Sequence, residues 1–185
     1  PKKPSLGIIG GSKISTKIAV IKGLTKKLDY LIIGGGMANT FLASKGYNLG
    51  LTHVEEEFFD EVVKIEESAF NSGCKLVLPI DVITSDSLKN TKEIKSCFIH
   101  NIGEKQRVFD IGSNSCKAIN KLFSKVKTVL WNGPMGAFEY KPFDNSTKIV
   151  GKFLSSKIKE YDLNVVVGGG DTVSSLKNLD ILDKF

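Results

Sequence analysis

Two lysines and one aspartate in this 185-residue sequence have the types and spacing that phosphate chemistry requires. Lys13 and Lys17 lie four residues apart, so on a helix they would share one face. One could meet a phosphoryl group in transfer while the other anchors a terminal phosphate. Asp171 follows three glycines and is suited to hold Mg²⁺, which prefers carboxylate and phosphate oxygens. Positioned positive charge and metal supply most of what phosphoryl transfer needs.

The same residues also have structural interpretations. Lysines are abundant in this sequence, so Lys13 and Lys17 could belong to a solvated helix face. Aspartate is a good N-cap, so Asp171 could simply begin a helix. Thr172 would add a hydroxyl and an N–H group at the same helix start. The choice depends on where the secondary structure places these side chains.

Glycines follow a short apolar run in four segments, which are LGIIGGSKIS, YLIIGGGMANTF, VLWNGPMGAF and VVVGGGDTVSS. Continuous apolar strands are buried on both faces, which indicates a parallel sheet covered by helices. The carboxyl ends of such strands share one edge, where helix N-termini favour phosphate. One glycine turn could serve only a tight bend, but four at one edge favour a phosphorylated ligand.

Helical spacing of apolar residues follows most of these strands, for example at Ile119, Leu122, Phe123 and Val126. KLVLPIDV and RVFDIG are two further strand candidates. We therefore predict one α/β domain over residues 1–185: a three-layer αβα, Rossmann-like, doubly wound parallel sheet of about six strands. Residues 85–106 break the rhythm and are expected to form a loop with a short hairpin around CFIH.

Thr52 and Glu55 have the spacing of a capping box. Acidic residues stabilise a helix N-terminus, so we assign the run Glu55 to Glu57 to that role rather than to a catalytic carboxylate pair.

Composition narrows the classes of partner. The net charge is +6, but Arg107 is the only arginine and the lysines are spread over every predicted helix, which favours a solvated surface or a small anionic ligand over nucleic acid. Three cysteines without a C-x-x-C pair argue against a disulfide framework or a zinc site. No apolar run approaches the roughly 20 residues of a membrane span. We expect a cytoplasmic monomer without membrane or nucleic-acid partners.

Five motifs then occur in a fixed order: GGSKISTKI, YLIIGGGMANTFL, LPIDVITSD, VLWNGPMGAFE and VVVGGGDT. Together they resemble the nucleotide-binding C-terminal domain of the phosphoglycerate kinase family, from about Gly7 to Lys177. The resemblance implies a glycolytic kinase that moves a phosphoryl group between ATP and 3-phosphoglycerate, with Mg²⁺, giving ADP and 1,3-bisphosphoglycerate. It also implies that 3-phosphoglycerate binds mainly to the family's N-terminal domain.

The resemblance implies a role for each matching residue. Lys13 would support the transferring group, Lys17 would hold nucleotide phosphate, and Asp171 would hold Mg²⁺. The remaining nucleotide contacts would be Gly11 and Ser12; Gly35, Gly36 and Gly112 around adenine; Asn132 near the phosphates; Pro134, Met135, Gly136 and Ala137 closing the pocket; Glu139 on the ribose hydroxyls; and Gly168, Gly169, Gly170 and Thr172 around the phosphates.

Some family features are changed or missing. Ser12 stands where the family usually has alanine, Thr16 where it often has aspartate, and only DIG is kept around Gly112. The N-terminal domain and a later TGGG loop are absent, so we expect a fragment that binds Mg-nucleotide with little turnover. A stand-alone nucleotide-binding module without catalysis is an alternative. A dinucleotide-dependent oxidoreductase is another, although G-x-G-x-x-G is absent.

Overall fold

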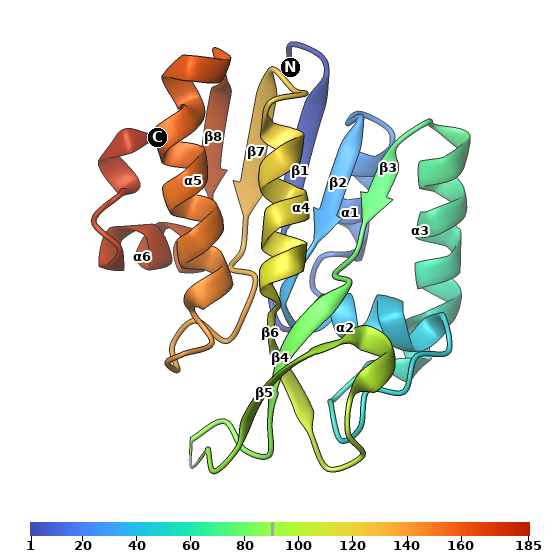
Figure 1. Ribbon diagram of the computed structural model, residues 1–185. Coiled ribbons are helices and arrows are strands. Elements are labelled where there is room, and N and C mark those ends of the chain that lie inside the picture. Colours follow the sequence, from blue (N-terminus) through green and yellow to red (C-terminus); the bar gives the residue numbers. More distant parts are fainter. Residues whose placement is uncertain (90) are drawn as a thin grey trace.

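The computed structural model of the chain describes residues 1–89 and 91–185. Its main sheet has five parallel strands in the order β3-β2-β1-β7-β8, whose carboxyl ends all lie toward the lower edge in Figure 1. The strands are β1 (Ser5–Ile9), β2 (Tyr30–Ile33), β3 (Lys75–Val77), β7 (Thr128–Asn132) and β8 (Asn164–Gly168). The inner strands are buried on both faces, as their apolar runs predict.

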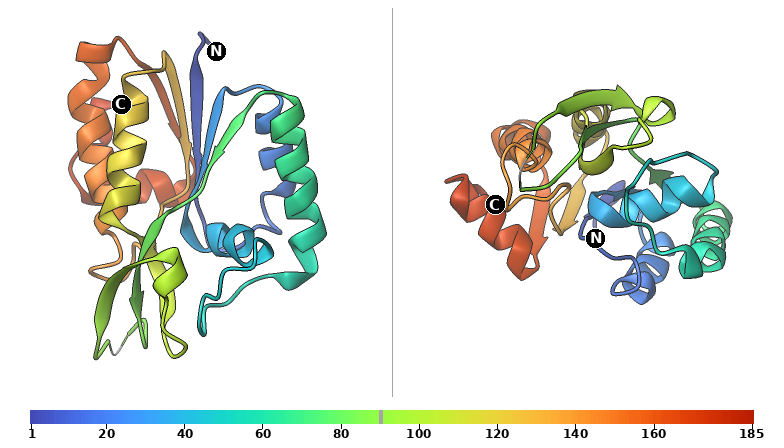
Figure 2. Two further views of the ribbon diagram at one scale, coloured as in Figure 1. Left: turned by 45° about the vertical axis from the view of Figure 1, so that its right-hand side comes forward. Right: turned by 90° about the horizontal axis from the view of Figure 1, so that it is seen from below.

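Helices cover both faces of this sheet (Figure 2), which confirms the predicted three-layer α/β class. On one side, α1 (Ile18–Thr25), α2 (Gly35–Ser44) and α3 (Phe59–Asn71) enclose one apolar core. On the other, α4 (Ser113–Phe123) and α5 (Asn145–Tyr161) enclose a second core that contains the fully buried Trp131. The last α-helix, α6 (Gly170–Asn178), follows the edge strand β8.

The main sheet has five parallel strands, where about six were predicted. KLVLPIDV does not form one strand: it splits at Pro79 into β3 and β4 (Asp81–Ser85). β4 pairs antiparallel with β5 (Ile94–Phe98) and with β6 (Arg107–Ile111), which is the RVFDIG candidate. These three strands form a separate small sheet beyond the carboxyl edge of the main one (Figure 1). Proline cannot donate a ladder hydrogen bond, so Pro79 favours the break.

The expected loop over 85–106 contains β5, and its position 90 lies outside the described residues. The first two residues of CFIH end β5, which pairs antiparallel with β4, and the other two begin the short helix η2 (Ile99–Asn101). The hairpin predicted around CFIH is therefore larger than expected and extends back to β4. The remaining short helices are η1 (Glu56–Phe58) and η3 (Leu182–Lys184).

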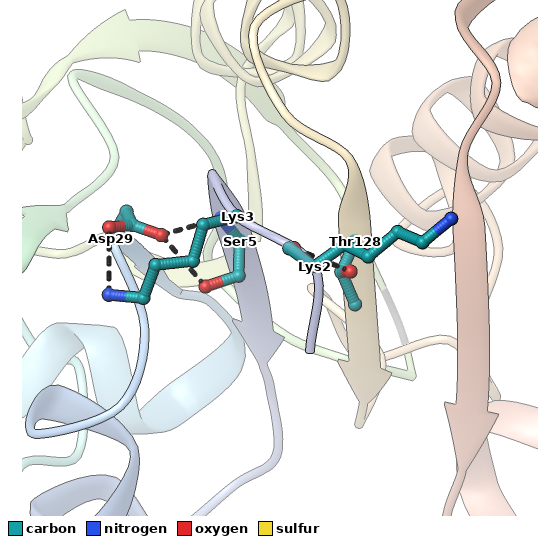
Figure 3. A network of polar contacts seen from close by, with 5 residues as sticks. All are labelled: Lys2, Lys3, Ser5, Asp29 and Thr128. Atoms are coloured by element: carbon teal, nitrogen blue, oxygen red, sulfur yellow. Dashed lines mark hydrogen bonds and ion pairs between the residues drawn. The ribbon is translucent and has the colours of Figure 1, made fainter.

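The opposite edge of the main sheet is fastened by a polar network at the amino end of β1 (Figure 3). Asp29 accepts hydrogen bonds from the backbone N–H (2.7 Å) and the hydroxyl (2.9 Å) of Ser5, and pairs with Lys3 at 3.3 Å. Thr128 donates to the carbonyl of Lys2 over 2.8 Å. This network ties the start of the chain to the amino ends of β1 and β7.

Candidate functional site

The strand order reverses between β1 and β7. From β1 the chain winds outward through β2 to β3, and from β7 it winds the other way to β8. Ligands of doubly wound sheets bind at the carboxyl ends of the strands beside such a reversal. Here the two loops touch, because the N–H of Gly10 donates to the carbonyl of Asn132 over 2.9 Å. A ligand is therefore expected to bind around this contact between Gly10 and Asn132.

Lys17 reaches into that point of reversal from the turn before α1. Its Nζ donates to the carbonyl of Gly10 (2.9 Å) and to Oδ1 of Asn132 (2.6 Å). Burial lowers the pKa of Lys17 from its usual value, and the negative charge of Asp171 partly offsets this effect. Lys17 is thus not part of a solvated helix face. It is a partly desolvated cation whose charge an incoming anion would stabilise.

Asp171 lies in the first turn of α6, one helical position after the start. The N-cap of α6 is Gly169, with no side-chain capping bond, so the interpretation of Asp171 as an N-cap was wrong. Its carboxylate is exposed. The neighbouring Thr172 is fully buried, and its hydroxyl accepts a 2.5 Å hydrogen bond from the N–H of Gly133. Thr172 therefore fixes α6 against the β7 loop, while Asp171 faces outward.

Packing requires several glycines of the first three turns. A Cβ on Gly10 would lie 1.9 Å from the carbonyl oxygen of Pro134, and one on Gly133 would lie 2.1 Å from that of Gly10. Gly35 and Gly36 approach the backbones of Gly11 and Ser12 in the same way, with an added Cβ 2.5 Å from a carbonyl oxygen in each case. These loops pack main chain against main chain, which side chains would prevent.

The glycines after β8 are different. Gly169 has φ 91°, a left-handed conformation that favours glycine, but Gly168 has only an Asn132 atom within 4 Å of an added Cβ, at 3.8 Å. Gly170 has nothing within 4 Å. Packing therefore does not require Gly170, and the space beside the N-terminus of α6 is open.

A small hollow of ≈ 20 Å³ lies between the first turns of α2, the loop after β7 and the antiparallel strands β4 and β6. Gly35, Gly36 and Met135 line it, as the resemblance implies, together with Val108 and Phe109, which the sequence did not single out. Gly112 lies apart from this lining. It is buried at the start of α4, where an added Cβ would lie 2.2 Å from Cγ of Asp81.

Asp110 forms the buried part of the same wall. Its carboxylate accepts hydrogen bonds from the backbone N–H of Ser146 (3.0 Å) and of Ile111 (2.9 Å), and from the hydroxyl of Ser146. Burial raises the pKa of Asp110 to about 7 despite these bonds. Gly136 lies directly against it, with an added Cβ 2.2 Å from Oδ1. Asp110 thus links the hollow to the start of α5.

Glu139 lies in a different and much larger hollow, of ≈ 1010 Å³, between the start of α5 and α6. Its side chain is exposed, and Lys148 and Ser174 line the same space. Ala137 lies between the two hollows, with its N–H bonded to the carbonyl of Phe109 over 2.8 Å. The residues expected around adenine and around ribose therefore line separate spaces.

Lys13 and Ser12 lie on an exposed loop before α1. The next residues are held by Glu55, whose carboxylate accepts hydrogen bonds from the N–H of Ile14 (2.6 Å) and from the hydroxyl of Ser15 (2.5 Å). The predicted capping box is therefore wrong: η1 begins at Glu56, and the hydroxyl of Thr52 accepts from Val108 instead. The role of Glu55 could not be predicted from the local sequence, because its partners Ile14 and Ser15 lie about forty residues away.

Comparisons with known proteins agree on one family. The family model described as "Phosphoglycerate kinase" matches residues 1–185. Phosphoglycerate kinases of Novosphingobium aromaticivorans and Rhizobium meliloti are 39% and 40% identical, and the alignments cover 100% of this chain and 47% and 46% of those proteins. The structure of phosphoglycerate kinase from Coxiella burnetii superposes with a TM-score of 0.93 at 35% identity, over 100% of this chain and 46% of that one. The chain thus spans about half the length of these relatives.

Proposed function

The chain belongs to the phosphoglycerate kinase family, and on that premise we propose that it binds Mg-ATP or Mg-ADP at the carboxyl edge of its parallel sheet. The whole protein would transfer a phosphoryl group reversibly between ATP and 3-phosphoglycerate, in glycolysis. The observation that carries the proposal is the meeting of Lys17 and Asn132, through a hydrogen bond, beside the N-terminus of α6, where the charge of Asp171 acts on Lys17.

The phosphates would lie at that meeting point. The first N–H groups of α6 are free of side-chain caps, and Gly170 leaves the main chain accessible. Lys17 would give up its hydrogen bond to Asn132 and bind a phosphate oxygen instead. Lys13 would extend its exposed side chain toward the transferring group. Thr172 would contribute its backbone, since its hydroxyl already binds Gly133.

Asp171 is the residue we propose for Mg²⁺. Among the described residues, no three His, Cys, Asp or Glu side chains gather where they could hold a metal. A single exposed carboxylate fits Mg²⁺, which keeps several waters and takes its other ligands from nucleotide phosphates. When bound, the ion would neutralise charge on the phosphates.

Adenine would enter the hollow lined by Gly35, Gly36 and Met135, and Glu139 would meet the ribose. At ≈ 20 Å³ the hollow is far smaller than a ligand pocket of several hundred Å³, so Met135 or Phe109 has to move as the base enters. Gly112 is packed against Asp81 and is not among the residues that line the hollow, whereas Phe109 is, so we propose Phe109 as an additional contact.

Calorimetric titration with Mg-ADP tests the proposal, with NADH as competitor. We expect Mg-ADP to bind and NADH not to displace it. Displacement by NADH would favour the oxidoreductase alternative. A phosphorylation assay with 3-phosphoglycerate should show little turnover by this chain, because that substrate would bind mainly elsewhere in the whole protein; full turnover would contradict this part of the proposal.

We also propose that the protein acts in the cytoplasm as a monomer without nucleic-acid partners. Cys74, Cys97 and Cys116 are free thiols, as is usual in a reducing compartment. In the described part of the chain, no helix combines the length and apolar character of a membrane span. Gel filtration, and Mg-ADP affinity that is insensitive to added DNA, would test the oligomeric state and the partners.

A further inference from the structure

Glu55 is a buried carboxylate with no role in the function proposed above. Only 7% of the residue is exposed. Its carboxylate accepts hydrogen bonds from Ile14 N–H (2.6 Å), Ser15 N–H (3.4 Å) and Ser15 Oγ (2.5 Å), all in the loop that carries Lys13. A buried charge is costly unless such bonds satisfy it, so this arrangement is held by several donors at once.

These contacts fix the main chain immediately after Lys13, at Ile14 and Ser15. The side chain of Ile14 is fully buried in the apolar core, and its N–H is bonded to Glu55. The carbonyl of Lys13 accepts a 2.9 Å hydrogen bond from the hydroxyl of Thr16. Lys13 therefore has a backbone that its neighbours hold in place and a side chain that is exposed, so its ammonium group extends from a fixed point on the loop.

Glu55 is itself fixed to the helix that borders the small hollow. Its N–H donates to the hydroxyl of Thr40 in α2 over 3.2 Å. The first residues of α2 are Gly35 and Gly36, which line that hollow. The carboxylate thus connects the loop of Lys13 to the element proposed to meet the base.

We propose that Glu55 is a positioning residue that places Lys13 at the phosphate chain of the bound nucleotide. The inference rests on the proposed nucleotide site. It adds that affinity for the triphosphate depends on the hydrogen bonds from Glu55 to Ile14 and Ser15 and not on the negative charge of Glu55.

Calorimetry with Mg-ATP on the 185-residue chain tests this inference. We expect Glu55→Ala to weaken binding about tenfold, since the buried hydrogen bonds to Ile14 and Ser15 are lost. Glu55→Gln should stay within about threefold, because its Oε1 can accept from Ile14 and its amide can donate to Ser15. Glu57→Ala removes an exposed carboxylate of the same run and should change nothing. A Gln variant as weak as the Ala variant would overturn the inference.

Two further measurements separate positioning from a general loss of structure. In a Lys13→Met background, Glu55→Ala should cost less than about threefold, because the two residues act through one contact; a full additional tenfold loss would overturn the inference. Amide exchange of Ile14 and Ser15, measured without nucleotide, should accelerate in Glu55→Ala or, if that variant does not fold, in Glu55→Asp. Unchanged exchange refutes the role of Glu55 even if nucleotide binds, whereas failure of the unmodified chain to bind nucleotide refutes the proposed site.

Discussion

The ammonium group of Lys17 donates a 2.6 Å hydrogen bond to Oδ1 of Asn132, across the point where the strand order reverses. The bond joins the loop after β1 to the end of β7, two elements more than one hundred residues apart in the chain. A phosphate that binds Lys17 has to compete with this amide. The free site therefore holds its cation in place before the ligand arrives.

Binding of Mg-ADP should make Lys17 take up a proton. Burial lowers the pKa of Lys17 in the free protein, and a phosphate beside it would raise that pKa again. Proton uptake should therefore increase as the pH rises toward the lowered pKa of the unbound lysine. Calorimetry in buffers of different ionisation enthalpy measures it. Lys17→Met should abolish the uptake and weaken binding about 10- to 100-fold, whereas the exposed Lys26→Met should do neither.

Gly170→Ala should separate ligand space from packing. An added Cβ at Gly170 meets nothing within 4 Å, so the free energy of unfolding should change by less than about 0.5 kcal/mol. Affinity for Mg-ADP should fall about tenfold if phosphate lies against this main chain.

Gly133→Ala is the contrasting variant. Its Cβ would lie 2.1 Å from the carbonyl oxygen of Gly10 at φ 101°, and we expect a loss of about 2 kcal/mol or more. Thermal unfolding and calorimetry measure both quantities.

The sequence was sufficient to predict the parallel sheet, because strands such as β1 and β2 are apolar throughout and buried on both faces. It was insufficient for β4 and β6. A short run such as RVFDI has the same composition whether it lies in a central parallel strand or in a half-exposed antiparallel one. Only the pairing partners distinguish the two, and those are set by the whole chain.

The candidate site could be predicted where function depends on residue type, and not where it depends on packing. Lys17 and Asp171 were identified from charge and spacing. The distinction between Gly133, which packing requires, and Gly170, which it does not, depends on neighbours that local sequence does not specify. Glu55 was missed for the same reason, since its partners Ile14 and Ser15 lie about forty residues away.

Asp110 should make the stability of the chain depend on pH. Burial raises its pKa to about 7, above the usual value of 3.8, so folding favours the protonated form. Its stabilising contribution is fully present below about pH 4 and is lost as pH rises through about 7. Asp110→Asn removes the titration, so the variant should gain stability relative to the unmodified chain between these pH values, by no more than roughly 4 kcal/mol. Chemical unfolding measured at several pH values gives the difference.

Asp183→Asn is the matched control for that series, because Asp183 is exposed. Its unfolding free energy should run parallel to that of the unmodified chain at every pH. If the Asp110→Asn curve also runs parallel, Asp110 stays ionised in the folded state and the hydrogen bonds from Ser146 and Ile111 outweigh its desolvation.

Asp171→Ala and Glu139→Ala should affect different parts of the bound nucleotide. Asp171 is exposed and makes no capping bond, so its loss should leave stability within about 0.5 kcal/mol. It should remove most of the increase in ADP affinity that Mg²⁺ produces, because the ion loses its protein ligand. Glu139→Ala should keep that increase but weaken ADP and adenosine about equally, by a few-fold, since a ribose contact is common to both. Calorimetry of ADP with and without Mg²⁺, and of adenosine alone, measures both effects. A full Mg²⁺ effect in Asp171→Ala would show that the metal is held elsewhere.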